Sequence, residues 1–207
     1  MKQLTLLCAM ALVSFMACQK ENASTSTIMA DNYLPLKVGN YWIYANSYVE
    51  SDGKETFSKE LDSVFVKKDT LINNQKYFIV ESSNPEFFGV GIVRDSLHYI
   101  VSNYGTKLFS SENLTDTLQN LGIKDLEMFI KARYRKMINE NNVESSVGTF
   151  NCLDSRINII LKESIDGNLA KYCHNYYAQD IGIIKRTASY LTSKSYQKAN
   201  LIRYKVQ

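Results

Sequence analysis

Short β-prone segments separated by turn residues occupy most of the chain after residue 32, and they limit the fold more than any other feature. Tyr41 to Val49 is rich in aromatic and β-branched residues, and Ser51-Asp52-Gly53-Lys54 follows it as a turn. Further turns are predicted at Asn73-Asn74 and at Asp166-Gly167-Asn168. Strands joined by such turns form consecutive hairpins, so we predict a mainly β domain built on an antiparallel sheet that curls or closes.

The other strands are predicted from the same pattern. They are Phe57–Lys68, Lys76–Ser82, Gly89–Asp95, Leu97–Ser102, Lys107–Ser110, Gly148–Lys162, Leu169–Ala178, Gly182–Leu191 and Asn200–Val206. Trp42, the only tryptophan, is predicted to pack in the core or at its rim. Gly182 lies between two isoleucines and predicts a bulge or bend.

The segment from residue 114 to residue 138 fits two patterns. Apolar residues between Ile123 and Met137 recur at spacings of three and four, which indicates a helix. Around Tyr134, however, apolar residues also alternate with Lys and Arg, which indicates a strand. We predict a short helix within residues 114–127 and a strand from Phe129 to Ile138, ended by the polar run 139–142. Helix and strand both stay open for residues 122–138.

The first 22 residues form a signal for export. Lys2 supplies a positive start, Leu4 to Phe15 are mostly apolar, and Ala17 precedes Cys18. The apolar stretch is much shorter than the ~20 residues of a membrane-spanning helix. A small residue, then cysteine, then a polar linker resembles the lipobox of bacterial lipoproteins, and the loose form with Phe15 in place of Leu resembles those of the Bacteroidetes. An ordinary secretory signal cut at a nearby alanine is the alternative.

This resemblance implies a lipid anchor on Cys18. Cleavage after Ala17 would leave a cysteine that receives a diacylglyceryl thioether and an N-linked acyl chain such as palmitate, and several chains together anchor a protein stably. We predict a signal peptide at residues 1–17, a flexible tether at 18–32 and a single β-rich domain at 33–207. The predicted location is the cell envelope, at the outer membrane, with its periplasmic and surface faces both open.

The lipid anchor changes the cysteine count. Cys8 leaves with the signal and Cys18 carries the anchor, so Cys152 and Cys173 remain in the domain. Because the export compartment is oxidising, we predict a disulfide between them across the Asp166-Gly167 turn, with two buried thiols as the alternative.

Charge excludes some classes of partner. The chain has 24 Lys and Arg against 21 Asp and Glu, and removal of Lys2 with the signal leaves a formal charge of +2. Basic and acidic residues interleave, so no basic stripe indicates nucleic acid binding and no acidic run indicates a disordered tail.

No motif for catalysis, cofactor binding or metal binding is found. The two histidines, His98 and His174, lie far apart in the sequence, and neither has cysteines or acids at metal-ligand spacing. The acids are spread singly, so no pair can be assigned to acid–base catalysis. We predict no catalytic residue, no cofactor and no metal, and we interpret both histidines as sheet or surface residues.

Three segments resemble a group of Bacteroidetes lipoproteins of unassigned function, the TapB-like proteins, which are related to the LolA/LolB/LppX half-barrels. They are Tyr33–Tyr44, Gly148–Cys152 and Tyr176–Lys185. The group commonly has Pro-Ala where this chain has Ser146-Val147. The resemblance implies an open antiparallel half-barrel with one or two short helices. In related half-barrels the concave face holds acyl chains, which by analogy of fold suggests an apolar ligand.

These features predict a lipid-anchored, non-catalytic envelope protein. An apolar ligand in the half-barrel would require a cavity of roughly 300 Å³ or more. The alternatives are a structural or interaction module, whose exposed aromatics contact a partner protein or an envelope polymer, and an enzyme acting on envelope glycans, which requires two converging acids. Four Asp-Ser/Thr-apolar triplets, at residues 62–64, 69–71, 95–97 and 116–118, also resemble acceptor sites for O-glycosylation, with ordinary strand turns as the alternative.

Overall fold

The computed structural model describes residues 32–88, 91–165 and 167–207. The predicted signal peptide, the flank residue Ala17, the predicted lipidation site Cys18 and nearly all of the predicted tether lie outside these residues. Among the described helices, none combines the length and the apolar character needed to cross a membrane.

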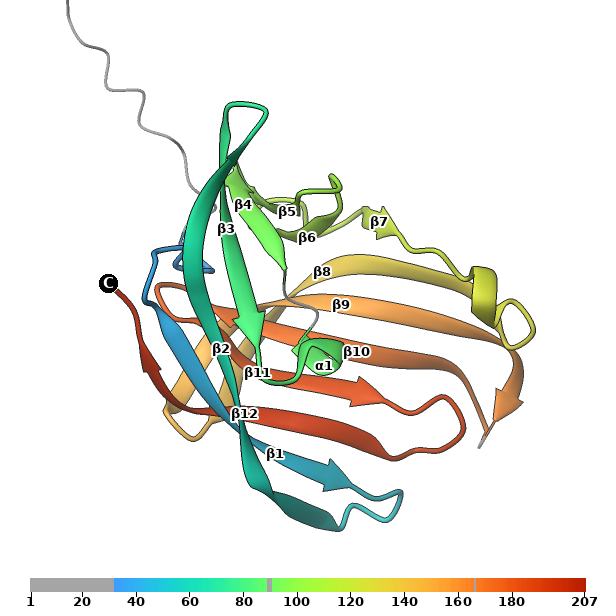
Figure 1. Ribbon diagram of the computed structural model, residues 1–207. Coiled ribbons are helices and arrows are strands. Elements are labelled where there is room, and N and C mark those ends of the chain that lie inside the picture. Colours follow the sequence, from blue (N-terminus) through green and yellow to red (C-terminus); the bar gives the residue numbers. More distant parts are fainter. Residues whose placement is uncertain (1–31, 89–90, 166) are drawn as a thin grey trace, which may run out of the picture.

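Within the described residues, twelve strands and one short α-helix form the domain (Figure 1). The elements are β1 (Tyr41–Val49), β2 (Glu55–Ile72), β3 (Gln75–Ser82), α1 (Pro85–Phe88), β4 (Ile92–Ser96), β5 (Tyr99–Ser102), β6 (Lys107–Ser110), β7 (Thr117–Asn120), the 3₁₀ turn η1 (Lys124–Leu126), β8 (Ile130–Ser145), β9 (Gly148–Ile165), β10 (Asn168–Ala178), β11 (Gly182–Ser189) and β12 (Tyr196–Lys205).

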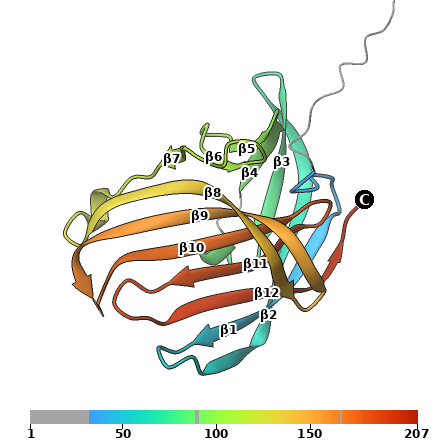
Figure 2. The same ribbon diagram turned by 180° about the vertical axis from the view of Figure 1, so that it is seen from behind.

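The strands form one antiparallel sheet in the order β6-β5-β4-β3-β2-β1-β12-β11-β10-β9-β8-β7. Every neighbour pair is consecutive in the chain except β1 and β12, whose pairing brings the two ends of the domain together. The sheet curls until its edge strands β6 and β7 approach each other, so it is a nearly closed barrel (Figures 1 and 2). The predicted mainly β, antiparallel and curled fold is confirmed.

The core fills the inside of the curl. Trp42 and Tyr44 alternate along β1, each is 1% exposed, and both pack in one apolar cluster. Helix α1 adds Phe87 and Phe88 to this cluster, and the Asn84 side chain caps the helix by accepting the N–H of Phe87 at 3.2 Å. The prediction that Trp42 packs in the core is confirmed.

The middle of the chain differs from the prediction. Within residues 114–127 the structure has a short helix, the 3₁₀ helix η1, but strand β7, which was not predicted, precedes it. Strand β8 begins near the predicted residue but continues to Ser145 through the polar run that was expected to end it. A bulge between Glu140 and Val143, with Asn142 at φ 56°, accommodates the extra residues while the hairpin with β9 continues.

The predicted disulfide is absent, because Cys152 and Cys173 are both free thiols. In the register of β9 with β10, Cys152 lies opposite Ala178 and Cys173 lies opposite Ile157. The two cysteines are therefore offset by five residues along the paired strands. Because five is odd, their side chains lie on opposite faces of the sheet. The alternative of two unpaired thiols describes the structure, and burial raises the pKa of the Cys152 thiol to about 12.

Candidate functional site

A groove of about 370 Å³ lies on the outer face of β10, β11 and β12, which run side by side (Figure 2). We define the outer face as the one turned away from the core. Along β10 the groove residues alternate with Tyr177 and Asn175, which point inward. The residues that line this outer groove are Tyr172, His174, Tyr176, Lys185, Thr187, Ser189, Tyr196 and Lys198.

Aromatic rings form one wall of the outer groove. His174 stacks on Tyr176 with ring centroids 5.4 Å apart and planes 3° apart, and Tyr172 lies 6.0 Å from His174 on the other side. The Arg156 guanidinium lies over the Tyr172 ring at 5.1 Å. These contacts hold the three rings in a row whose members are exposed or half-buried.

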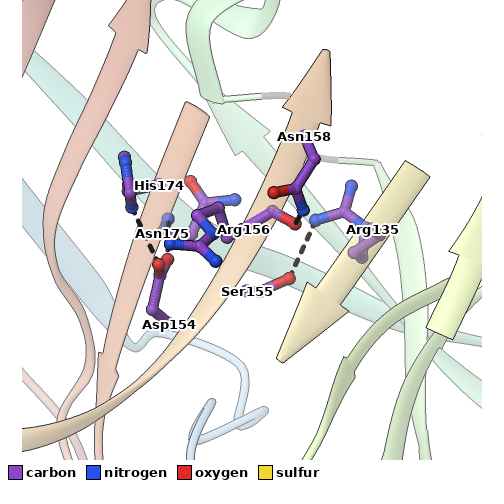
Figure 3. Close-up of polar contacts among 7 residues, drawn as sticks. All are labelled: Arg135, Asp154, Ser155, Arg156, Asn158, His174 and Asn175. Carbon is purple, nitrogen blue, oxygen red and sulfur yellow. Dashed lines mark hydrogen bonds and ion pairs between the residues drawn. The ribbon is translucent and has the colours of Figure 1, made fainter. Parts of the chain in front are cut away.

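A buried carboxylate orients the histidine (Figure 3). Asp154 on β9 is 0% exposed, its Oδ2 lies 2.8 Å from His174 Nδ1, and its Oδ1 accepts the backbone N–H of Asn175 at 3.2 Å. Since the carboxylate accepts a hydrogen bond from Nδ1–H, Nε2 is the ring nitrogen left for the groove. Burial, followed by the charge of Asp154, raises the pKa of Tyr176, so this phenol stays neutral.

Two lysines supply the charge of the groove. Lys185 lies opposite Tyr176, and Lys198 lies opposite Thr187 in the adjacent pair of strands. Lys198 makes an ion pair with Glu55. Burial, followed by repulsion from Lys198, lowers the pKa of Lys185. The groove thus combines flat rings, hydrogen-bond donors and positive charge.

The His174–Asp154 pair lacks the third member of a hydrolase triad. No hydroxyl or thiol donates to the His174 ring in the described residues. The same part of the chain contains no group of three or more His, Cys, Asp or Glu residues placed to hold a metal ion. The arrangement can bind and orient a ligand, and Thr187, which lies opposite His174 on β11, brings a hydroxyl group to the same face.

A second open cleft of about 390 Å³ lies where β1, β2 and α1 meet. Its carboxylates are Glu60 and Asp62. Asp62 accepts hydrogen bonds from Asn46 at 2.7 Å, from Asn84 at 3.1 Å and from Ser83 at 3.2 Å. These bonds connect β2 to β1 and to the start of α1, so we assign Asp62 a structural role.

A small apolar cavity lies in the interior around Trp42, Tyr44 and Tyr177. Its volume is about 60 Å³, which is roughly the space of two water molecules. The cavity predicted for an apolar ligand, of roughly 300 Å³ or more, is not formed there.

The comparisons find no protein-family model and no curated protein that matches the chain. Among solved structures, one match is a candidate lipoprotein from Parabacteroides distasonis ATCC 8503, with 10% identity and a TM-score of 0.43 over 84% of this chain and 98% of that one. Another is a candidate exported protein with a YmcC-like fold from Bacteroides fragilis NCTC 9343, with 13% identity and a TM-score of 0.39 over 83% and 98%. Both scores are below 0.5, so no function is transferred from either protein. The kinship with TapB-like proteins and half-barrels stays a prediction.

The segments and histidines singled out in the sequence lie in different parts of the structure. The segment Tyr176–Lys185 forms the β10–β11 hairpin and supplies both end residues to the outer groove. His98 lies between β4 and β5, and its Nδ1 is 3.0 Å from Glu112 Oε1. The partnership of His174 with Asp154 was missed, because the two residues are 20 positions apart and only the β9–β10 register brings them together.

Proposed function

We propose that this protein is a lipid-anchored, non-catalytic binding module of the cell envelope, and that its outer groove binds a carbohydrate polymer. The observation that supports this proposal is the row of Tyr172, His174 and Tyr176 along one side of a groove that also contains Lys185 and Lys198. Sugar rings present apolar C–H faces and hydroxyl edges. Aromatic rings pack against the C–H faces of a sugar, and lysine and hydroxyl groups form hydrogen bonds with its hydroxyl groups.

The groove suits a polymer better than a small apolar molecule. It is open and polar at its rim, and the aromatic row extends along β10 in the direction of the strand. A chain of sugars could lie along such a surface with neighbouring rings on neighbouring side chains. The 60 Å³ interior cavity, in contrast, has no room for an acyl chain.

The non-catalytic part of the proposal rests on the side chains around His174. Asp154 lies opposite Tyr176 on the outer face, but it is 0% exposed, and its two carboxylate oxygens are occupied by His174 and by the backbone N–H of Asn175. The residues that line the groove include no aspartate or glutamate. Glycan hydrolysis commonly needs two carboxylates that flank the bond to be cleaved.

Glycan binding can be tested with a Tyr172→Ala variant. We expect the purified protein to bind one or more envelope glycans on an oligosaccharide array, and the variant to bind about tenfold more weakly, since a stacked ring is lost. Tyr104→Ala is the matched control, because Tyr104 is 90% exposed in the β5–β6 turn and lies outside the groove. Equal binding by both variants would contradict the glycan site. Glycan cleavage that depends on His174 would contradict the non-catalytic assignment.

The anchor is tested separately with Cys18→Ser. We expect the native protein to take up labelled palmitate and to fractionate with the outer membrane. The variant should lose both properties, because no thioether can form. Retention of the label in the variant would refute the anchor at Cys18.

A further inference from the structure

A row of residues on the outer face crosses five strands, from the outer groove to β2. In the register of the sheet each member lies directly opposite the next, in the order His174 on β10, Thr187 on β11, Lys198 on β12, Ser47 on β1 and Phe57 on β2. Residues directly opposite each other share one face of a sheet, so Phe57 lies on the face that carries the groove. The five strands lie side by side (Figure 2), and the row spans about 19 Å at the usual spacing of strands.

Phe57 ends this row with an exposed aromatic ring. Its exposed fraction is 66%, and among the described residues it belongs to neither of the two apolar clusters. A single exposed phenylalanine is ordinary on a protein surface, so exposure alone gives it no role. Its position does distinguish it, because it lies in line with the aromatic rings of the groove and on the same face.

Polar groups occupy the row between its two aromatic ends. Lys198 Nζ makes an ion pair with Glu55 Oε1, and Ser47 Oγ donates to the same oxygen at 2.6 Å. Both members of the ion pair are partly exposed, so they offer a donor and an acceptor to a ligand. Lys198 lines the outer groove, and together with Phe57 it also lines the cleft where β1, β2 and α1 meet. Lys198 therefore connects the groove to the surface around Phe57.

We propose that Phe57 is a second aromatic subsite for the glycan of the outer groove, and that the polymer continues from the β10 rings across β11, β12 and β1 to β2. This inference rests on the proposed function of the groove. Sugar rings stack on the aromatic side chains at the two ends of the row, and the Lys198–Glu55 pair between them forms hydrogen bonds with sugar hydroxyl groups. A glycan too short to span the row contacts only one end, so affinity rises with glycan length.

The test measures binding of the purified protein as a function of glycan length. The probes are chito-oligosaccharides, manno-oligosaccharides and oligogalacturonates, each as a series from disaccharide to octasaccharide on one array. In a series that binds, we expect the octasaccharide to bind at least about tenfold more tightly than the disaccharide. Phe57→Ala should lose this gain while its disaccharide binding stays unchanged, which also shows that the variant is folded. Phe57→Trp keeps a flat ring and should keep the gain.

The matched control is Phe129→Ala, because Phe129 is 55% exposed and lines neither the groove nor the cleft. It should bind every length as the native protein does. A native protein without a gain in affinity with length, or a Phe57→Ala variant that keeps the gain, would overturn the second subsite and leave the groove standing. Tyr172→Ala tests the groove itself and should weaken binding at every length. If Tyr172→Ala binds like the native protein, or if no series binds, the proposed function fails and the subsite fails with it.

Discussion

Asp95 shows at the scale of one residue how burial changes the chemistry of this domain. It lies on β4 opposite Ile100, which is 0% exposed, so its carboxyl group is turned toward the core. Burial raises the pKa of this carboxyl from 3.8 to about 6, and no neighbouring charge contributes to the shift. The ionised form is therefore disfavoured in the folded protein.

This pKa predicts a pH dependence of stability. Below about pH 4 the group is protonated in both the folded and unfolded states. Between pH 4 and pH 6 the folded state holds the proton more tightly, so the free energy of unfolding falls as the pH rises. Asp95→Asn should remove this fall and raise the free energy of unfolding above pH 6 by up to about 3 kcal/mol, measured by urea unfolding at pH 4 and pH 7.5.

Asp69→Asn is the control for this prediction. Lys76 lowers the pKa of the exposed Asp69, which is the opposite direction, so the substitution should not stabilise the protein at pH 7.5. If Asp95→Asn gives the same free energy of unfolding as the parent at pH 7.5, the Asp95 carboxyl is not buried as described.

At the scale of elements, the turn of the β10–β11 hairpin packs against Trp42 of β1. Gly182, the first residue of β11, has a φ of +109°, and the indole of Trp42 lies against it. Trp42 Nε1 donates to the carbonyl of Ile181, so the turn and the strand are bonded as well as packed. The predicted bend at Gly182 is present, and its reason is this close approach in addition to the backbone conformation.

Gly182→Ala should therefore destabilise the protein more than a positive φ alone requires. An added Cβ would lie 2.9 Å from Trp42 Nε1, whereas at Gly53, with φ +90°, nothing lies within 4 Å. Both variants incur the cost of the backbone conformation. We expect Gly182→Ala to lower the free energy of unfolding by about 1–3 kcal/mol more than Gly53→Ala, measured by urea unfolding. Equal losses would mean that Trp42 moves aside freely.

Prediction of elements from the sequence succeeded where local signals agreed. Tyr41–Val49 coincides with β1, which largely alternates and is followed by a clear turn, and Lys107–Ser110 coincides with β6. Asn141 and Asn142 carry an equally clear turn signal, yet β8 passes through them. Pairing with β9 on both sides of the bulge outweighs the local preference of two asparagines.

At the scale of the whole molecule, the seam between β6 and β7 decides how far the barrel closes. Lys107 N–H donates to Gln119 Oε1 at 3.4 Å across the seam. Ser155 on β9 donates to the carbonyl of Leu108 at 2.6 Å and accepts from Arg135, so it joins the edge strand β6 to the far side of the sheet. Side-chain hydrogen bonds therefore join the two edges of the sheet, β6 and β7, which are not paired as neighbouring strands.

Ser155→Ala should loosen this seam. We expect faster hydrogen exchange in β6 and a loss of about 1–2 kcal/mol in the free energy of unfolding, since the Leu108 carbonyl and the Arg135 N–H would lose a buried partner. Ser58→Ala, at an exposed position of β2 where the hydroxyl accepts only the nearby N–H of Glu60, should change neither quantity. Unchanged exchange in β6 would show that other contacts close the barrel.

The sequence by itself determined the class of this fold, because alternation and turn residues act within a few positions of one another. Only the tertiary structure decided which distant residues meet. The β9–β10 register brought Asp154 to His174 and kept Cys152 away from Cys173, and the curl of the sheet brought Ser155 on β9 to the carbonyl of Leu108 on β6. Register and curl depend on bulges and on pairing summed over whole strands, and a shift of one residue would exchange the two faces of the sheet.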